Sequence, residues 1–237
     1  MAPQATRPRR TQNPQRTNAD RQVKGVRRQQ GHEGLDGGVE YGRMHQVGSC
    51  RQCGGRLERI LVTHTHKDHS PGAAALAQAT GVPVWGRRPL HPQWQDEGFA
   101  PDHEPAHGDR ITAGPAATLR VVHTPGHASN HLCYLLEEEK TLLTGDHVMQ
   151  GSTVVINPPD GDMVAYMASL HALLALDLDW LAPGHGFLMA QPHRAIQRLL
   201  AHREAREAKV LVALGGHEPI SLQELLARVY DDVPTNR

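Results

Sequence analysis

From Leu57 onward, short apolar runs alternate with segments of helical spacing, and each apolar run is followed by a polar turn. The apolar runs predict short buried strands. They cover residues 59–63, 82–86 and 119–127, the two arms of a hairpin at 131–146, and residues 178–186. An alternation of strands with helices is typical of the α/β class, so we predict an α/β domain over residues 57–191.

Helical segments are predicted between these strands. Residues 70–81 have Pro71 near their start and Gly81 at their end, which are common helix boundaries. Residues 162–176 have the apolar spacing of a helix that packs on one face. Residues 87–118 are rich in Pro, Gly and His and predict loops and edge hairpins.

The last part of the chain, residues 192–237, is predicted to be a helical extension. A long helix is expected over 192–216 and a second over 221–230, where Ser221 and Glu224 have the spacing of a capping box. Two interpretations of this helix pair are open: it is either the start of a truncated winged-helix-like module or a helical pair that packs on the main domain.

Charge divides the chain near Leu57. Residues 1–56 contain 11 Lys and Arg against 4 Asp and Glu, so the formal net charge of zero hides a basic first part and an acidic remainder. This first segment has no apolar run of strand length, and we expect it to be disordered. It is either a natural basic tail that contacts nucleic acid through phosphates or a frame-shifted or mis-started reading. The abrupt change at Leu57 favours the second interpretation.

Several classes of protein are disfavoured by composition. No run of about 18 apolar residues is present, so no membrane partner is predicted. The polar start has no apolar segment of a secretory signal, and three cysteines do not make a disulfide framework, so we predict a cytoplasmic location. Cys50 and Cys53 form half of a zinc knuckle without a second half, and we interpret the pair as accidental.

Chemistry-bearing side chains follow four of the predicted strand ends. The stretch "LVTHTHKDHSPG" contains H-x-H-x-D-H directly after a strand, and "HTPGH", "TGDH" and "PGHG" follow later strands. Loops at strand ends are exposed while the strands hold them in place. The candidate metal ligands are His64, His66, Asp68, His69, His127, Asp146 and His185.

These ligand types favour zinc, which binds imidazole and carboxylate and keeps an open position at catalytic sites. Seven ligands are the number needed for two metal ions that share one ligand. We therefore predict two zinc ions per chain, with iron or manganese as alternatives that the same ligands accept. Asp68, His131 and His147 are also candidate catalytic residues. The two histidines would shuttle protons or orient ligands, or they are simply partly buried strand residues.

The pattern resembles that of the metallo-β-lactamase-fold hydrolases, whose H-x-H-x-D-H signature is followed by a later His, an Asp and a final His. The resemblance implies a four-layer αββα sandwich with the metal site along one edge. It also implies a ligand assignment: His64, His66 and His127 on the first metal, Asp68, His69 and His185 on the second, and Asp146 bridging them. A water that bridges the metals would be the nucleophile.

Within that family, residues 123–155 and 202–214 resemble the β-lactamase-like protein 2 (LACTB2-like) group, including its linker into a C-terminal winged helix. The human member of this group is an endoribonuclease that selects single strands. Residues 1–56 depart from the family, because they lack the apolar strands that normally precede the histidine cluster.

The sequence thus predicts a metal-dependent hydrolase that cleaves an ester, a thioester or a phosphodiester in a small-molecule substrate. One alternative is an endoribonuclease of the β-lactamase-like protein 2 type, with RNA as partner. The other is a non-catalytic remnant that binds metal or nucleic acid. A glyoxalase II activity is disfavoured because no glutathione-binding segment is recognisable, and β-lactam hydrolysis because no secretory signal is present.

Overall fold

The computed structural model describes residues 57–114, 116–215 and 219–233. The chain divides into two units, Met1–Arg56 and Leu57–Arg237, and every element described below belongs to the second. The predictions for residues 1–56, including the Cys50 and Cys53 pair, lie outside the described residues. None of the helices in the described ranges is long and apolar enough to cross a membrane.

The larger of two sheets has six strands in the order β3-β4-β5-β6-β7-β8. Their bounds are β3 Arg110–Thr112, β4 Thr118–His123, β5 Leu132–Leu136, β6 Thr141–Gly145, β7 Trp180–Pro183 and β8 Met189–Ala190. Neighbouring strands are antiparallel except β6 and β7, which run parallel. The β5–β6 pair confirms the predicted hairpin, and its acidic run forms a short 3₁₀ helix, Glu137–Glu139.

The smaller sheet contains the parallel strands β1, Ile60–Leu61, and β2, Val84–Trp85, joined through helix α3, Gly72–Thr80. The predicted helix here is confirmed, and Gly81 ends it with a φ of 73°, in the left-handed region that favours glycine. Both strands are shorter than predicted. After β1 the chain leaves the ladder, and the Thr63 carbonyl accepts a hydrogen bond from Leu132 N at 2.7 Å.

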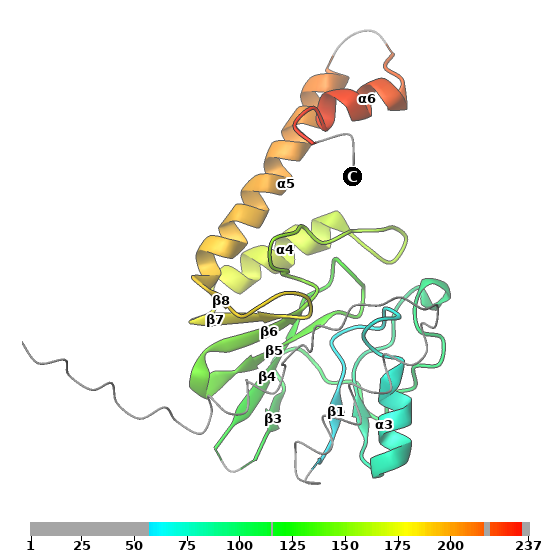
Figure 1. The fold of residues 1–237 in the computed structure, drawn as a ribbon, viewed down its shortest axis with the longest axis vertical. Helices are drawn as coiled ribbons and strands as arrows, with labels where there is room; N and C mark the ends of the chain where they lie inside the picture. Colours follow the sequence, from blue (N-terminus) through cyan, green and yellow to red (C-terminus); the bar gives the residue numbers. More distant parts are fainter. Residues whose placement is uncertain (1–56, 115, 216–218, 234–237) are drawn as a thin grey trace, which may run out of the picture. The chain divides into compact units, whose positions relative to one another are not determined.

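Three apolar clusters show that the domain has four layers (Figure 1). Successive strand residues face opposite sides of the large sheet, so Val122 and Cys133 contact the helices while Val121 and Tyr134 contact the small sheet. A third cluster packs α3 on the outer face of the small sheet. The order is helix, sheet, sheet, helix, which confirms the predicted four-layer αββα fold.

The helices on the large sheet are α4, Met163–Leu174, and the first half of α5, Pro192–Leu214. Asp162 caps α4 by accepting a hydrogen bond from Ala165 N at 2.9 Å. The chain ends in α6, Leu222–Val229, which packs on the second half of α5 (Figure 1). Ser221 caps α6 through Glu224 N, as the capping spacing predicts. The two predicted helices are therefore present, while the winged-helix interpretation stays a prediction.

Strand directions bring the histidine- and aspartate-bearing loops to one edge of the domain. β4 and β6 are both antiparallel to β5, and β7 is parallel to β6, so these three strands end at the same edge. The hydrogen bond from Leu132 N to Thr63 O places the end of β1 beside them. The four loops predicted to contain ligands therefore meet, although their sequences are far apart.

Candidate metal centre

The first ligand group consists of His64, His66 and His127, which come from the loops after β1 and β4. One ligand atom from each lies within 4.8 Å of the others. The ring centroids of His64 and His66 are 4.7 Å apart, and those of His66 and His127 are 4.5 Å apart. Three imidazoles thus converge on one point at the edge of the sheets.

Hydrogen bonds set the orientation of two of these rings. His127 Nδ1 lies 2.7 Å from the carbonyl oxygen of Val155, so Nδ1 has to donate and the lone pair of Nε2 points into the group. His64 Nδ1 lies 3.1 Å from Thr63 Oγ1, which leaves its Nε2 free as well. The chain therefore fixes in advance the nitrogen that each histidine presents.

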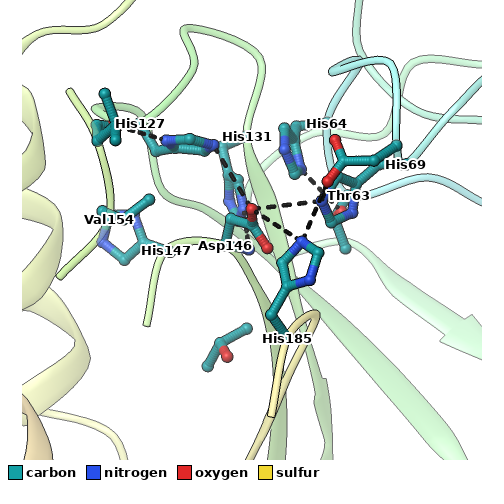
Figure 2. Close-up of polar contacts among 12 residues, drawn as sticks. Thr63, His64, His69, His127, His131, Asp146, His147, Val154 and His185 are labelled. Carbon is teal, nitrogen blue, oxygen red and sulfur yellow. Dashed lines mark hydrogen bonds and ion pairs between the residues drawn. The ribbon is translucent and has the colours of Figure 1, made fainter. Parts of the chain in front are cut away.

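The second ligand group consists of Asp68, His69, Asp146 and His185, which come from the loops after β1, β6 and β7. His185 Nε2 lies 3.1 Å from Asp68 Oδ2 and 3.6 Å from Asp146 Oδ2. His69 Nε2 lies 3.3 Å from Asp146 Oδ2. Figure 2 shows His69, Asp146 and His185 directed toward one another.

Asp146 is shared between the two groups. Its Oδ2 is 3.9 Å from His127 Nε2 in the first group and within 3.6 Å of two histidine nitrogens in the second. No other carboxylate oxygen among the described residues has recorded contacts of this kind to both groups. This is the position that a bridging ligand would need.

Gly184 allows the loop after β7 to approach this closely. A Cβ atom at this position would lie 2.7 Å from Asp146 Oδ1 and 3.0 Å from His69 Cε1. Both distances are too short for a side chain, so the Pro-Gly turn before His185 has a steric reason. The predicted strand at 178–186 ends at Pro183, because the chain turns here to present His185.

The pKa values of the histidines are shifted in opposite directions in the two groups. Burial, with a contribution from nearby histidines, lowers the pKa of His64 well below its usual value, and burial lowers the pKa of His127 too. Burial opposes charge on His69 as well, but Asp146 and Asp68 outweigh it and raise the pKa of His69. The first group therefore offers neutral imidazoles, and the second adds two carboxylates.

His131 and His147 are fully buried next to the ligands. His131 Nε2 accepts a hydrogen bond from Asp146 N at 3.2 Å, and its Nδ1 lies 2.9 Å from Thr124 Oγ1. Neither ring nitrogen of His147 has a hydrogen-bond partner among the described residues, and burial lowers its pKa to about 3. Of the predicted roles, these surroundings favour orientation of a candidate ligand for His131, while His147 makes no hydrogen bond to any of them.

The side chains fit a metal ion. His64 Nε2, His127 Nε2 and Asp146 Oδ1 are buried and have no hydrogen-bond partner in the described part of the chain. Buried polar atoms without partners are costly and rare, whereas a cation would satisfy all of them. Imidazole with carboxylate is a ligand set that zinc, iron and manganese accept.

Comparison with known families decides the assignment. Residues 52–185 match the family model described as the metallo-beta-lactamase superfamily. The chain belongs to the metallo-β-lactamase superfamily. The match covers more than half of the chain and contains all seven predicted ligands, so the resemblance noted from the sequence is confirmed.

Curated relatives of this superfamily member include several fungal proteins. It is 35% identical to "Lactamase-like protein vrtG" of Penicillium aethiopicum over 75% of this chain and 57% of the relative. It is 35% identical to "Thioesterase pkgB" of Emericella nidulans over 68% and 44%. It is 29% identical to "Beta-lactamase-like protein 2 homolog" of Caenorhabditis elegans over 75% and 59%. The chain thus spans about half the length of these relatives.

Solved structures show the same fold. A β-lactamase domain protein from Burkholderia ambifaria aligns with a TM-score of 0.68 at 23% identity, covering 81% of this chain and 70% of that one. The protein TTHA1623, crystallised in a di-iron-bound form, aligns with a TM-score of 0.56 at 26% identity, covering 68% and 84%.

The sequence supplied the seven candidate ligands, and the family resemblance implied their division into two groups, but neither indicated the residues that hold them in place. Thr63 and the Val155 carbonyl orient two histidines, and neither has a chemical signature of its own. Thr65, inside the histidine motif, and Asp160, in "PPDGD", take part in a buried network described below. Of these residues, only Thr65 could have been suspected from the sequence, because it is a polar residue inside the histidine motif.

Proposed function

We propose that this chain is a metal-dependent hydrolase that binds two divalent cations, with zinc as the first candidate, and cleaves a thioester. The observation that carries the proposal is the position of Asp146 Oδ2 within 4 Å of ligand nitrogens from both groups. Thioesters are preferred over esters and phosphodiesters because a relative with 35% identity is named a thioesterase.

In this proposal the two cations take the ligands that the sequence pattern suggested. His64, His66 and His127 would hold the first, Asp68, His69 and His185 would hold the second, and Asp146, which lies with the second group and 3.9 Å from His127 Nε2, would be available to both. When bound, the pair would lower the pKa of a water molecule and polarise the substrate carbonyl. Iron and manganese remain alternatives to zinc, since the ligand set accepts each and TTHA1623 was crystallised with two irons.

The other residues orient these ligands or handle protons. Val155 and Thr63 hold His127 and His64 with Nε2 facing inward. His131 holds the backbone of Asp146. Asp68 has a side chain that is 60% exposed, and its carboxylate could accept a proton from the attacking water and pass it to the departing thiolate.

The test compares four substrates on one preparation. Protein loaded with zinc, iron or manganese, and protein treated with chelator, is given an acyl-coenzyme A thioester, an aryl ester, an aryl phosphodiester and single-stranded RNA. The proposal predicts metal-dependent thioester cleavage with a kcat/KM well above that for the other three. His66→Ala should abolish it, while His202→Ala, at an exposed position of α5, should not.

Each other outcome has a defined meaning. Metal-dependent RNA cleavage without thioester cleavage favours the endoribonuclease alternative suggested by the likeness to the β-lactamase-like protein 2 group. Cation binding without hydrolysis of any substrate favours a metal-binding protein without catalysis. Equal metal content in wild type and His66→Ala would show that the seven side chains do not form the centre at all.

A further inference from the structure

A ring of side-chain hydrogen bonds lies buried beside the first ligand group. Thr65 Oγ1 donates to Gln95 Oε1 at 2.9 Å and accepts from Asn130 Nδ2 at 2.8 Å. Gln95 Nε2 donates to Asp160 Oδ2 at 2.8 Å. Asp160 in turn accepts from Ser129, at 3.0 Å from its backbone N and 2.5 Å from its Oγ. Because Ser129 and Asn130 are consecutive, the ring is closed.

Four members of the ring are almost completely buried. The exposed fraction is 0% for Thr65, 2% for Gln95, 1% for Asn130 and 6% for Asp160. The three bonds that join these four residues therefore form away from bulk water, where a missing partner is costly, while the bonds from Ser129 are partly buried. Asp160 also accepts from His91 N at 3.4 Å, so its carboxylate gathers four donors.

The ring joins the two loops that supply the first ligand group. Thr65 stands between His64 and His66, while Ser129 and Asn130 follow His127 by two and three residues. One backbone hydrogen bond joins these segments next to the ring, from Leu132 N to Thr63 O, and the Asn130–Thr65 side-chain bond joins them within it. The three ligand atoms have to stay within 4.8 Å of one another to share a cation.

A second contact holds the loop after β1 from the same segment. Asp96 N donates to the Thr65 carbonyl at 2.8 Å, and Asp96 Oδ2 accepts from Ser70 Oγ at 2.7 Å. Gln95 and Asp96 thus hold the histidine loop at its middle and at its end. This segment lies in the region that the sequence predicted as loops and edge hairpins.

We propose that the closed ring of Thr65, Gln95, Asp160, Ser129 and Asn130 is a positioning device that sets the affinity of the first ligand group for its cation. None of these residues is itself a ligand. The inference rests on the metal centre of the proposed function, but not on which bond is cleaved. It makes Thr65 and Asp160 positioning residues for a cation that they do not touch.

The first test is a pair of substitutions at Thr65. Thr65→Val keeps the shape but removes the hydroxyl, which leaves Gln95 Oε1 without its donor, whereas Thr65→Ser restores the hydroxyl. Zinc affinity is measured by chelator competition on the full chain, and the ligand field is read from the absorption bands of bound Co²⁺. Valine should weaken the zinc of the first ligand group by about 10–100-fold and alter the Co²⁺ bands. Serine should restore both, and the zinc of the second group should change less.

The second test uses two aspartates in the same loop. Asp160→Ala removes the acceptor of three donors in the ring and of His91 N outside it. Asp162→Ala removes only the cap of α4 and serves as the matched control. Both should lower the thermal midpoint of the metal-free protein. Only Asp160→Ala should weaken the zinc of the first ligand group. Combining it with Thr65→Val should add little, because both substitutions break the same ring.

The outcomes separate this inference from the proposed function. If wild type binds no cation, the metal centre fails and the ring has no cation to position. If wild type binds cations and Thr65→Val and Asp160→Ala bind them equally well, with lower midpoints, the ring only stabilises the fold and the inference is wrong. Fully additive losses in the double variant would also overturn it. Should Thr65→Val not fold, Asp160→Ala against Asp162→Ala decides alone.

Discussion

The two ligand groups share Asp146 but differ in how the chain holds them. In the first group His64 is 1% exposed and His127 is 8% exposed, and both rings are oriented by hydrogen bonds to residues outside the group, Thr63 and Val155. In the second group the side chains of Asp68 and His185 are 60% and 48% exposed, and their recorded polar contacts are to members of their own group.

This difference has an energetic consequence. An oriented, buried side chain loses little further freedom when a cation arrives, whereas an exposed side chain has to be ordered at that moment. We therefore expect the first cation to bind more tightly than the second. The comparison also shows that one sequence motif can supply similar side chains to two sites, while differences in burial and hydrogen bonding make the affinities of the two sites unequal.

The largest effect is expected where the two groups meet. Asp146→Ala removes the carboxylate that contacts both, so both cations should be weakened and metal-dependent turnover should fall by about 10³-fold or more. Metal content after dialysis and kcat/KM are the measurements. The exposed Asp179→Ala is the control. A variant that keeps both cations and most activity would contradict the shared role of Asp146.

Removing one histidine from each group tests whether the two groups bind their cations with unequal affinity. His127→Ala should weaken the tighter cation by more than about 100-fold, since even residues behind a ligand contribute 10–100-fold. His185→Ala should leave that cation in place and remove only the weaker one. Chelator titration with metal analysis follows both. The account would be wrong if the two variants lost the same cation to the same extent.

The burial of His147 beside the first group predicts that the metal-free protein is destabilised by acid. Burial holds the pKa of His147 at about 3 in the folded state, against about 6.5 when unfolded. Below pH 6.5 this histidine binds a proton in the unfolded state but not in the folded state, so the free energy of unfolding decreases as the pH falls. At pH 5 the decrease caused by this histidine is about 2 kcal/mol. Urea unfolding of His147→Phe in chelator should show a pH 7 to pH 5 loss smaller by that amount, and an unchanged loss would refute this reading.

A smaller change is expected from crowding the second group at Gly184. Gly184→Ala places a methyl group against Asp146 Oδ1 and His69 Cε1, so it should weaken the second cation by about 10-fold and the first by less, because only Asp146 is shared between the groups. Gly215→Ala, at the end of α5, is the control. Zinc titration and the thermal midpoint check both variants, and equal weakening of the two cations would count against separate groups.

The sequence allowed the candidate ligands to be predicted because they follow strand ends in a compact motif, and strands that end at one edge bring such motifs together. The four-layer order also followed from the family resemblance. The supporting residues could not be predicted in this way. Thr65, Gln95 and Asp160 are ordinary polar residues, and their bonds exist because loops separated by 30 and 65 residues meet. Strand lengths were overestimated where the chain leaves a ladder early, as after Leu61.

The most direct test of the account is a zinc titration of the wild-type chain with a competing chelator and metal analysis. Two unequal steps of about one equivalent each are expected, with the tighter step lost in His127→Ala and retained in His185→Ala. A chain that binds less than one equivalent, or whose tighter step survives loss of His127, would contradict the claim that these seven side chains form two unequal cation sites around Asp146.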